Sequence, residues 1–196
     1  YRTLKPLYPR IKLVSIGEGE SEAPFKMRIL DYARTLGLKV FDRESNDQEQ
    51  TDSDIFFLGF QSNPFQFMKS SRLLIFPSVF EGFPNTILEA MECGLPVVAA
   101  DCNTGPRFIL APDSTLTNHT EKFELAKFGI LVPPLVNAEM NTVIAPAIVE
   151  EWTEAVGLLL TENNLRNKYI AAGPERVKDF DKKRILNQWE LLLSGE

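Results

Sequence analysis

The stretch PSVFEGFPNTILEAM, residues 77–91, is the most informative part of the sequence, because it joins an apolar run to a helical pattern through one tight turn. The run Leu73–Pro77 is apolar throughout, which is typical of a strand buried on both faces of a sheet. Gly82 lies in the turn, and Pro84 suits the first position of a helix, where its missing N–H leaves no hydrogen bond unmade. The stretch therefore predicts a buried strand, a tight turn and a helix over Pro84–Cys93.

The same alternation of short apolar runs and helical patterns continues on both sides of this stretch. We predict further strands at Ile11–Ile16, Leu38–Phe41, Ile55–Phe60, Pro96–Ala100 and Gly129–Val132. We predict further helices at Pro24–Leu36, Pro64–Ser71, Gly105–Leu110 and over most of Pro146–Leu193, with a break near Gly173 and Pro174. In the last helices, apolar spacing predicts a core-facing stripe with Trp152, Leu158, Trp189 and Leu192. Strands alternating with helices form βαβ units, so the fold class is α/β, an open, doubly wound, Rossmann-like parallel sheet.

Composition limits the classes of partner and of site. The net charge of −6 argues against a general attraction to nucleic acid or anionic lipid. Cys93 and Cys102 lack C-x-x-C spacing and are expected to be reduced thiols. The single histidine, His119, is expected to lie solvated in a loop, which argues against zinc. No apolar run reaches the roughly 18 residues of a membrane span, and no signal-peptide pattern is present.

Open parallel sheets bind ligands beyond the carboxyl ends of their strands. This rule selects the loops at Gly17–Ser21, Phe60–Pro64, Ser78–Thr86, Asp101–Arg107 and Pro133–Asn137. At the end of the third loop, the amides of Asn85 and Thr86 are expected to lie unpaired at the positive end of the helix dipole. A phosphate fits such a position.

Two carboxylates and a glycine flank these amides. Gly82 allows the backbone to approach a ligand closely. Glu89 lies one helical turn beyond Asn85, and its carboxylate suits vicinal hydroxyls, since each oxygen can accept one O–H bond. Glu81 precedes the turn, at the mouth of the same cleft. Taken alone, these features also fit an ordinary strand-to-helix turn with solvated glutamates, and Glu92 is expected to be only an exposed charge.

Glu81 and Glu89 have the E-x7-E spacing, and the chain resembles the large family-4 group of retaining, two-domain (GT-B) glycosyltransferases. The match includes Pro-Ser at 77–78, Glu-Gly-Phe-Pro at 81–84, Leu-Glu-Ala-Met at 88–91 and Cys-Gly-Leu-Pro-Val-Val-Ala-Ala-Asp at 93–101. Thr-Gly-Pro-Arg at 104–107 is similar to the version in bacterial transferases that build surface glycans. Residues 12–19 and 57–60 fall where the family has its base-side loops, so the resemblance spans residues 4–136.

The resemblance implies that residues 1–196 form the donor (nucleotide-sugar) binding domain, with carboxy-terminal helices from about residue 146. Glu81 would be the catalytic residue that contacts the transferred sugar, and Glu89 would hold the ribose hydroxyls. The other implied nucleotide-sugar contacts are Gly82, Phe83, Pro84, Asn85 and Thr86 at the diphosphate and sugar, Gly17 near the nucleotide, and Phe60 and Gln61 against the base.

The implied activity is transfer of a sugar, with retention, from a nucleotide-sugar, foremost a UDP-sugar, to a glycan or lipid-linked acceptor. The leaving diphosphate would deprotonate the acceptor, so positioning and charge stabilisation are the expected contributions of the protein. No metal cofactor is expected, because no Asp-x-Asp follows a predicted strand. Nucleic acid is not an expected partner. The expected location is the cytoplasm, and the resemblance leaves open a peripheral attachment of the full-length protein to the inner face of the membrane.

Two alternatives and several departures accompany this interpretation. A nucleotide-sugar 2-epimerase has the same architecture, and a non-catalytic nucleotide-binding module keeps the fold, although intact Glu81 and Glu89 argue against the latter. Phe108 stands where the family is usually acidic. Arg107 fits an anion contact and a surface salt bridge equally well, and Ala138–Ala147 is longer than expected.

The chain starts at Tyr1 rather than Met, which suggests a fragment, so absent targeting signals say little about the parent protein. The family's Arg and Lys that neutralise the diphosphate, on a loop before Ile11, would then be missing. The amino-terminal, acceptor-binding domain would be missing as well. In the family the last helix crosses back to that domain, so an exposed apolar patch on this chain would not be surprising. We therefore expect the isolated chain to fold and to bind nucleotide weakly, but to transfer no sugar.

Overall fold

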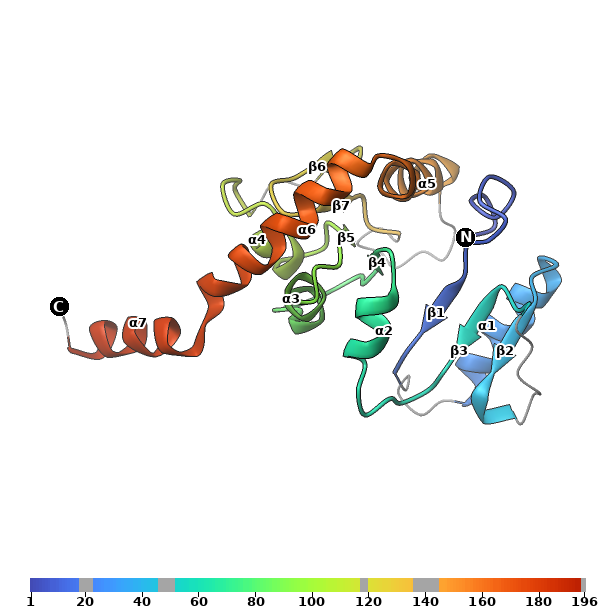
Figure 1. Cartoon of the computed structure of the whole chain (residues 1–196), viewed down its shortest axis with the longest axis horizontal. Coiled ribbons are helices and arrows are strands. Elements are labelled where there is room, and N and C mark those ends of the chain that lie inside the picture. Colours follow the sequence, from blue (N-terminus) through green and yellow to red (C-terminus); the bar gives the residue numbers. More distant parts are fainter. Residues whose placement is uncertain (18–22, 46–51, 117–119, 136–144, 195–196) are drawn as a thin grey trace. The chain divides into compact units, whose positions relative to one another are not determined.

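The computed structural model describes residues 1–17, 23–45, 52–116, 120–135 and 145–194. The chain divides into two compact units, Tyr1–Pro64 and Phe65–Glu196 (Figure 1). The expectations for His119, for most of the loop after Gly17, for much of the acidic loop before Ile55 and for most of Ala138–Ala147 lie outside the described residues.

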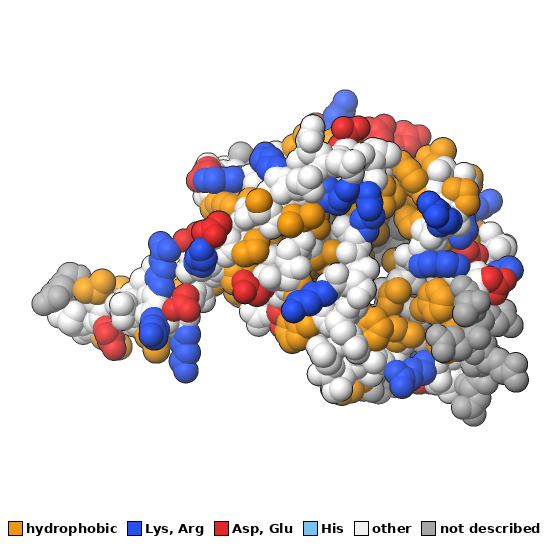
Figure 2. Space-filling model, in the orientation of Figure 1, with side chains coloured by type: hydrophobic (Ala, Val, Ile, Leu, Met, Phe, Trp, Pro, Cys, Tyr) orange, Lys and Arg blue, Asp and Glu red, His pale blue; other side chains and the backbone are white. Residues whose placement is uncertain are grey.

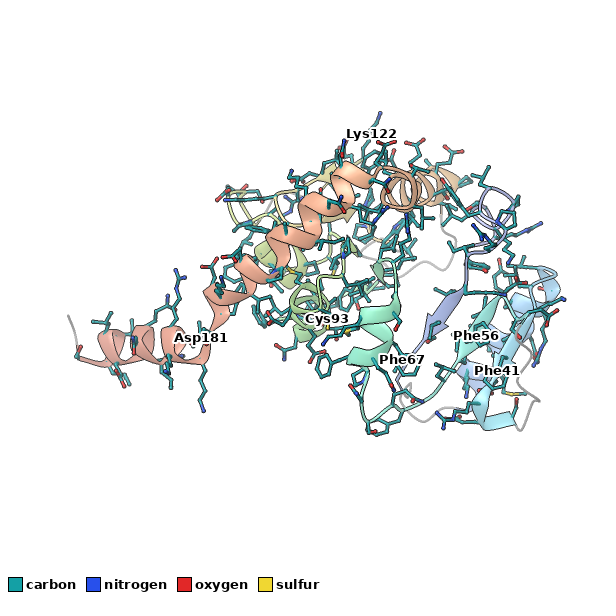
Figure 3. All side chains as sticks on the ribbon, viewed as in Figure 1. Phe41, Phe56, Phe67, Cys93, Lys122 and Asp181 are labelled. Carbon is teal, nitrogen blue, oxygen red and sulfur yellow. The ribbon has the colours of Figure 1, made fainter. Side chains whose placement is uncertain are left out.

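The first unit is built on a three-stranded parallel sheet in the order β1-β3-β2. Its elements are β1 (Leu13–Ser15), α1 (Ala23–Thr35), β2 (Val40–Asp42), a 3-10 turn (Arg43–Ser45) and β3 (Ile55–Phe57). Leu30 and Ala33 of α1 are buried, as are Phe41 and Ile55 of the sheet. Phe41 lies against Phe56 with ring centroids 5.9 Å apart (Figure 3). These residues form the core of the unit.

The second unit holds a four-stranded sheet in the order β4-β5-β7-β6. Its strands are β4 (Leu74–Phe76), β5 (Val97–Ala100), β6 (Glu124–Leu125) and β7 (Ile130–Val132). β4, β5 and β7 are parallel, and β6 runs antiparallel to β7. β5 and β7 are buried throughout, whereas β4 is half-buried because it lies at the edge of the sheet. The strand predicted at Leu73–Pro77 is thus present, but the prediction that it is fully buried is wrong.

The helices of the second unit are α2 (Phe65–Ser70), α3 (Asn85–Glu92), α4 (Gly105–Leu110), α5 (Pro146–Thr161), α6 (Asn163–Val177) and α7 (Lys182–Ser194). Ile87 and Met91 of α3 pack with Ile109 and Leu110 of α4 and with Leu131 of β7 in the main apolar core. The predicted α/β class with parallel strands is confirmed, and the described strand pairs form one sheet in each unit.

The helix break predicted near Gly173 and Pro174 is wrong, since both residues lie inside α6. The helical run is interrupted instead at Glu162 and Asp181, which have extended backbone with ψ of 91° and 136°. A Cβ on Gly173 would lie 3.0 Å from the carbonyl oxygen of Met91 in α3. The glycine therefore allows two helices to cross closely rather than ending one of them.

The apolar residues of α7 do not reach a core among the described residues. α5 buries Trp152, whose indole Nε1 donates a hydrogen bond to the Pro133 carbonyl at 3.0 Å. Trp189 and Leu192 of α7, in contrast, are 57% and 72% exposed, so the prediction that they face a core is wrong. α7 begins after the extended Asp181, and charged and apolar side chains are interspersed on its surface (Figures 2 and 3). No helix in the described ranges has the length and apolar character needed to cross a bilayer.

Tyr169 offers a test of the packing of α6. Its ring is buried, its hydroxyl donates to the Ala126 carbonyl at 3.2 Å, and burial raises its pKa from 10.0 to about 12. The pKa of Tyr169 is higher in the folded chain than in the unfolded chain. The buried, protonated Tyr169 hydroxyl therefore contributes fully to stability below about pH 10, and this contribution is lost as the pH rises toward about 12. The ultraviolet absorbance of phenolate is measured against pH for the parent chain and for Tyr169→Phe. The difference between the two absorbances should stay at zero until the pH approaches about 12. A difference that titrates near pH 10 would mean that the ring is solvated.

Candidate functional site

The amino end of α3 presents two unpaired backbone amides. Pro84 is the N-cap residue, with φ −80° and ψ 94°, rather than the first helical residue, and its carbonyl accepts from the Ile87 amide at 3.1 Å. Asn85 and Thr86 are exposed and open the helix, and neither amide has a hydrogen-bond acceptor within the described part of the chain. The first amides of a helix lie at the positive end of its dipole, so this end can bind an anion.

Two half-buried carboxylates belong to the same region. Glu89 lies one turn into α3 beyond Asn85, and Glu81 lies in the entry loop. By entry loop we mean residues 81–86, which follow β4 and include the first two residues of α3. Neither carboxylate forms an ion pair or a side-chain hydrogen bond with any described residue. Both glutamates can therefore accept hydrogen bonds from a ligand. A Cβ built on Gly82 would meet no atom within 4 Å, so the space beside that glycine is open.

The support loop, residues 101–107, follows β5 and includes the first turn of α4, and it fixes the backbone of Glu81. The Glu81 amide donates to the Asn103 carbonyl at 3.1 Å, and the Thr104 amide donates to the Glu81 carbonyl at 2.8 Å. A Cβ on Gly105 would lie 2.2 Å from Pro84 Cδ and 2.7 Å from the Gly82 carbonyl oxygen. Two of the three loops that the carboxyl-end rule selected in this unit, Ser78–Thr86 and Asp101–Arg107, are therefore in direct contact.

A buried thiol lies next to Glu81. Cys93 and Cys102 are both free, and Cys102 is only 3% exposed. Burial, together with the nearby charge of Glu81, raises the pKa of the Cys102 thiol. The raised pKa favours the neutral thiol of Cys102 over its thiolate, the form that acts as a nucleophile.

Arg107 is buried and forms an internal ion pair. Both predictions for it, an anion contact and a surface salt bridge, are therefore wrong. Its guanidinium is 3% exposed and binds the fully buried Asp101 through both carboxylate oxygens, with Nε–Oδ1 at 2.9 Å and Nη2–Oδ2 at 2.6 Å. Nη2 also contacts Glu124 Oε2 at 2.9 Å, and Nη1 donates to Ser114 Oγ at 3.0 Å. Burial opposes the charged form of Arg107, but the hydrogen bonds to Asp101 and Glu124 outweigh it and raise its pKa.

An aromatic cluster that the sequence did not predict adjoins the entry loop. Phe83, Phe108 and Phe180 meet edge to face, with ring centroids 5.3 to 6.4 Å apart. The guanidinium of Arg176 lies 4.6 Å from the Phe180 ring centroid and donates to the carbonyls of Phe108 and Ile109 at the end of α4. The cluster lines a cavity of about 500 Å³. The one sequence signal was Phe108 itself, an aromatic residue where an acidic one was expected.

The candidate base contacts Gly17, Phe60 and Gln61 lie together in the first unit. Gly17 has φ +119°, and its amide donates to the Gly59 carbonyl at 3.0 Å. Phe60 is 69% exposed, and Gln61 Nε2 donates to the Leu58 carbonyl at 2.7 Å. These residues occupy the carboxyl edge of β1 and β3, the position expected from the topology. Within the described residues, no group of three His, Cys, Asp or Glu could hold a metal ion.

Residues 2–140 match the family model described as Glycosyl transferases group 1. Over its whole length, the chain is 32% identical to an uncharacterized glycosyltransferase of Methanocaldococcus jannaschii and covers 45% of it. It is 32% identical to lipopolysaccharide 1,6-galactosyltransferase of Escherichia coli over 74% of this chain and 41% of that protein. The structure of Anabaena HepE in complex with UDP superposes on 96% of this chain and 42% of that one, with TM-score 0.63 and 22% identity, which shows a shared fold. The chain spans less than half of the length of these curated relatives.

The contact between the two loops can be tested with a pair of glycine substitutions. Gly105→Ala places a methyl group against Pro84 and the backbone of Gly82, and such overpacking should lower the free energy of unfolding by about 1–3 kcal/mol. Gly82→Ala is the matched control, because its methyl group would meet open space. Urea denaturation of both variants measures the difference. Equal stabilities would show that the loops are not in contact at Gly105.

Proposed function

The chain belongs to the Glycosyl transferases group 1 family, and from this premise we propose that residues 1–196 are the donor-binding domain of a retaining glycosyltransferase. In this proposal, the start of α3 binds the diphosphate of a UDP-sugar. The supporting observation is that the amides of Asn85 and Thr86, and the Glu89 carboxylate one turn further along the same helix, have no partner among the described residues.

The diphosphate would accept hydrogen bonds from the two amides, and the helix dipole would favour its charge. The entry loop supplies the surrounding surface. Gly82 leaves open space on one side, and the backbone of Phe83 and the N-cap Pro84 lead directly into the amides. Because the support loop holds this backbone, the donors are oriented before the ligand arrives, which reduces the cost of binding.

Glu89 and Glu81 would have different tasks. The Glu89 carboxylate would accept hydrogen bonds from the two ribose hydroxyls, since it has no competing partner among the described residues. Glu81 would lie beside the transferred sugar, where positive charge develops at the anomeric carbon as the diphosphate leaves. A carboxylate whose backbone is fixed by two hydrogen bonds suits that task, because preorganised charge stabilises a transition state most effectively.

Gly17, Phe60 and Gln61 would contact the base, by analogy with the family. The exposed ring of Phe60 offers an apolar face, and the positive φ of Gly17 allows a bend that other residues adopt only with strain. UDP in the Anabaena structure and the galactosyl transfer in the name of the Escherichia coli relative support a UDP-sugar donor and a glycan or lipid-linked acceptor. The acceptor would bind to a second domain. The leaving diphosphate would take the acceptor proton, without a metal ion or a covalent nucleophile.

Titration of the chain with UDP tests the binding site. Glu89→Ala should weaken binding by about 1–3 kcal/mol, or roughly 5- to 150-fold, because the ribose loses hydrogen bonds to a charged acceptor. Glu92→Ala, an exposed glutamate on the same helix, should bind as the parent does. If Glu89→Ala keeps the parent affinity, the ribose is bound elsewhere.

Steady-state kinetics of the complete enzyme test the role of Glu81. Glu81→Gln keeps the shape of the side chain and removes its charge, so kcat and kcat/KM should fall together while the affinity for UDP is unchanged. Glu92→Gln serves as the control. Normal turnover by Glu81→Gln would remove this residue from the catalytic machinery, and sugar release or epimer formation without an acceptor would favour an epimerase.

A further inference from the structure

We infer that Arg107 is a positioning residue. By pairing with Asp101 it holds the two ends of the support loop together, and the support loop in turn sets the geometry of the entry loop. This inference rests on the proposed function of the entry loop in binding the donor. Arg107 would act on the donor site indirectly. A buried ion pair with Asp101 holds the support loop, and the support loop holds the backbone of Glu81.

The ion pair closes the support loop at both ends. Asp101 follows directly after β5, and Arg107 lies in α4, so their bidentate contact joins the end of a buried strand to the helix that follows it. The pair is anchored on other sides as well. The Asp101 amide donates to the Val132 carbonyl at 2.8 Å, Asp101 Oδ2 accepts from the Thr120 amide at 2.7 Å, and Arg107 contacts Glu124 and Ser114.

The backbone hydrogen bonds and the close glycine contact to the entry loop come from residues that lie between Asp101 and Arg107. Asn103 and Thr104 exchange two backbone hydrogen bonds with Glu81, and Gly105 lies against Pro84 and Gly82. Asn103 and Thr104 are themselves exposed, so burial does not fix them. Their positions depend on the two ends of the loop, which the ion pair holds.

The geometry of the guanidinium matters as much as its charge. The planar fork of arginine matches both oxygens of a carboxylate, whereas a lysine ammonium is a point charge on a flexible stem. A buried ion pair often adds little net stability, so we attribute the role of this ion pair to the geometry that it imposes on the loop. Core strands β5 and β7 are buried through apolar side chains and depend less on the pair.

Arg107→Lys keeps the positive charge but removes the planar fork that binds both oxygens of Asp101. Arg176→Lys is its matched control. Arg176 is also buried, but it binds the carbonyls of Phe108 and Ile109 in α4 and does not pair with Asp101. Each variant of the chain is measured by calorimetry with UDP and by amide hydrogen exchange. Arg107→Lys should weaken UDP binding about tenfold and reduce exchange protection at the Glu81 and Thr104 amides, while β5 keeps its protection. Arg176→Lys should leave both readouts at the values of the parent.

Glu124→Gln provides a milder change if Arg107→Lys does not fold, because Glu124 is partly exposed and holds only one edge of the guanidinium. It should shift both readouts in the same direction by a smaller amount. The inference is overturned if the Arg107 variant keeps the parent's UDP affinity and exchange pattern, or if Arg176→Lys loses as much of both. Absence of UDP binding by the parent itself would contradict the proposed function instead, and the exchange comparison would still decide whether Arg107 holds Glu81.

Discussion

Contact between two loops at the carboxyl ends of β4 and β5 is the constraint on which the candidate site depends. Gly105 lies against Pro84 and Gly82, and Thr104 pairs with the backbone of Glu81. A side chain at position 105 would separate the loops and move the start of α3 with them. The unpaired amides and the two free carboxylates are arranged by this contact, while the buried strands beneath supply a rigid base.

Much of the architecture is readable from the sequence because it depends on local patterns. The apolar run of β5 and the helical spacing after Pro84 specify their elements without reference to the rest of the chain, and α4 spans the predicted residues. The turn before α3 was predicted because Gly82 and Pro84 are typical of a strand-to-helix turn, and its candidate function came from the family resemblance of the surrounding residues. The family resemblance is confirmed by the match over residues 2–140. The roles of the individual site residues remain predictions.

The features that the sequence did not predict depend on contacts between distant segments. Gly173 was interpreted as a helix break, but it allows α6 to cross α3, and no local signal distinguishes the two uses. Arg107 was expected at the surface or at an anion, because its partner Asp101 becomes a partner only when β5 and α4 are folded together. The spacing of the apolar residues in α7 predicts one apolar face of a helix. It does not show whether that face packs against a core, and Trp189 and Leu192 are exposed.

An amide-resolved titration with UDP measures whether the amino end of α3 binds the diphosphate. In a nitrogen–proton correlation spectrum of the chain, the amides of Asn85 and Thr86 should show some of the largest shifts on addition of UDP, because they would donate directly to phosphate oxygens. The amides at the start of α6, Asn164 and Leu165, should not respond, although they also open a helix. Saturable shifts of other amides, with those of Asn85 and Thr86 unchanged, would show that the diphosphate does not bind at the start of α3.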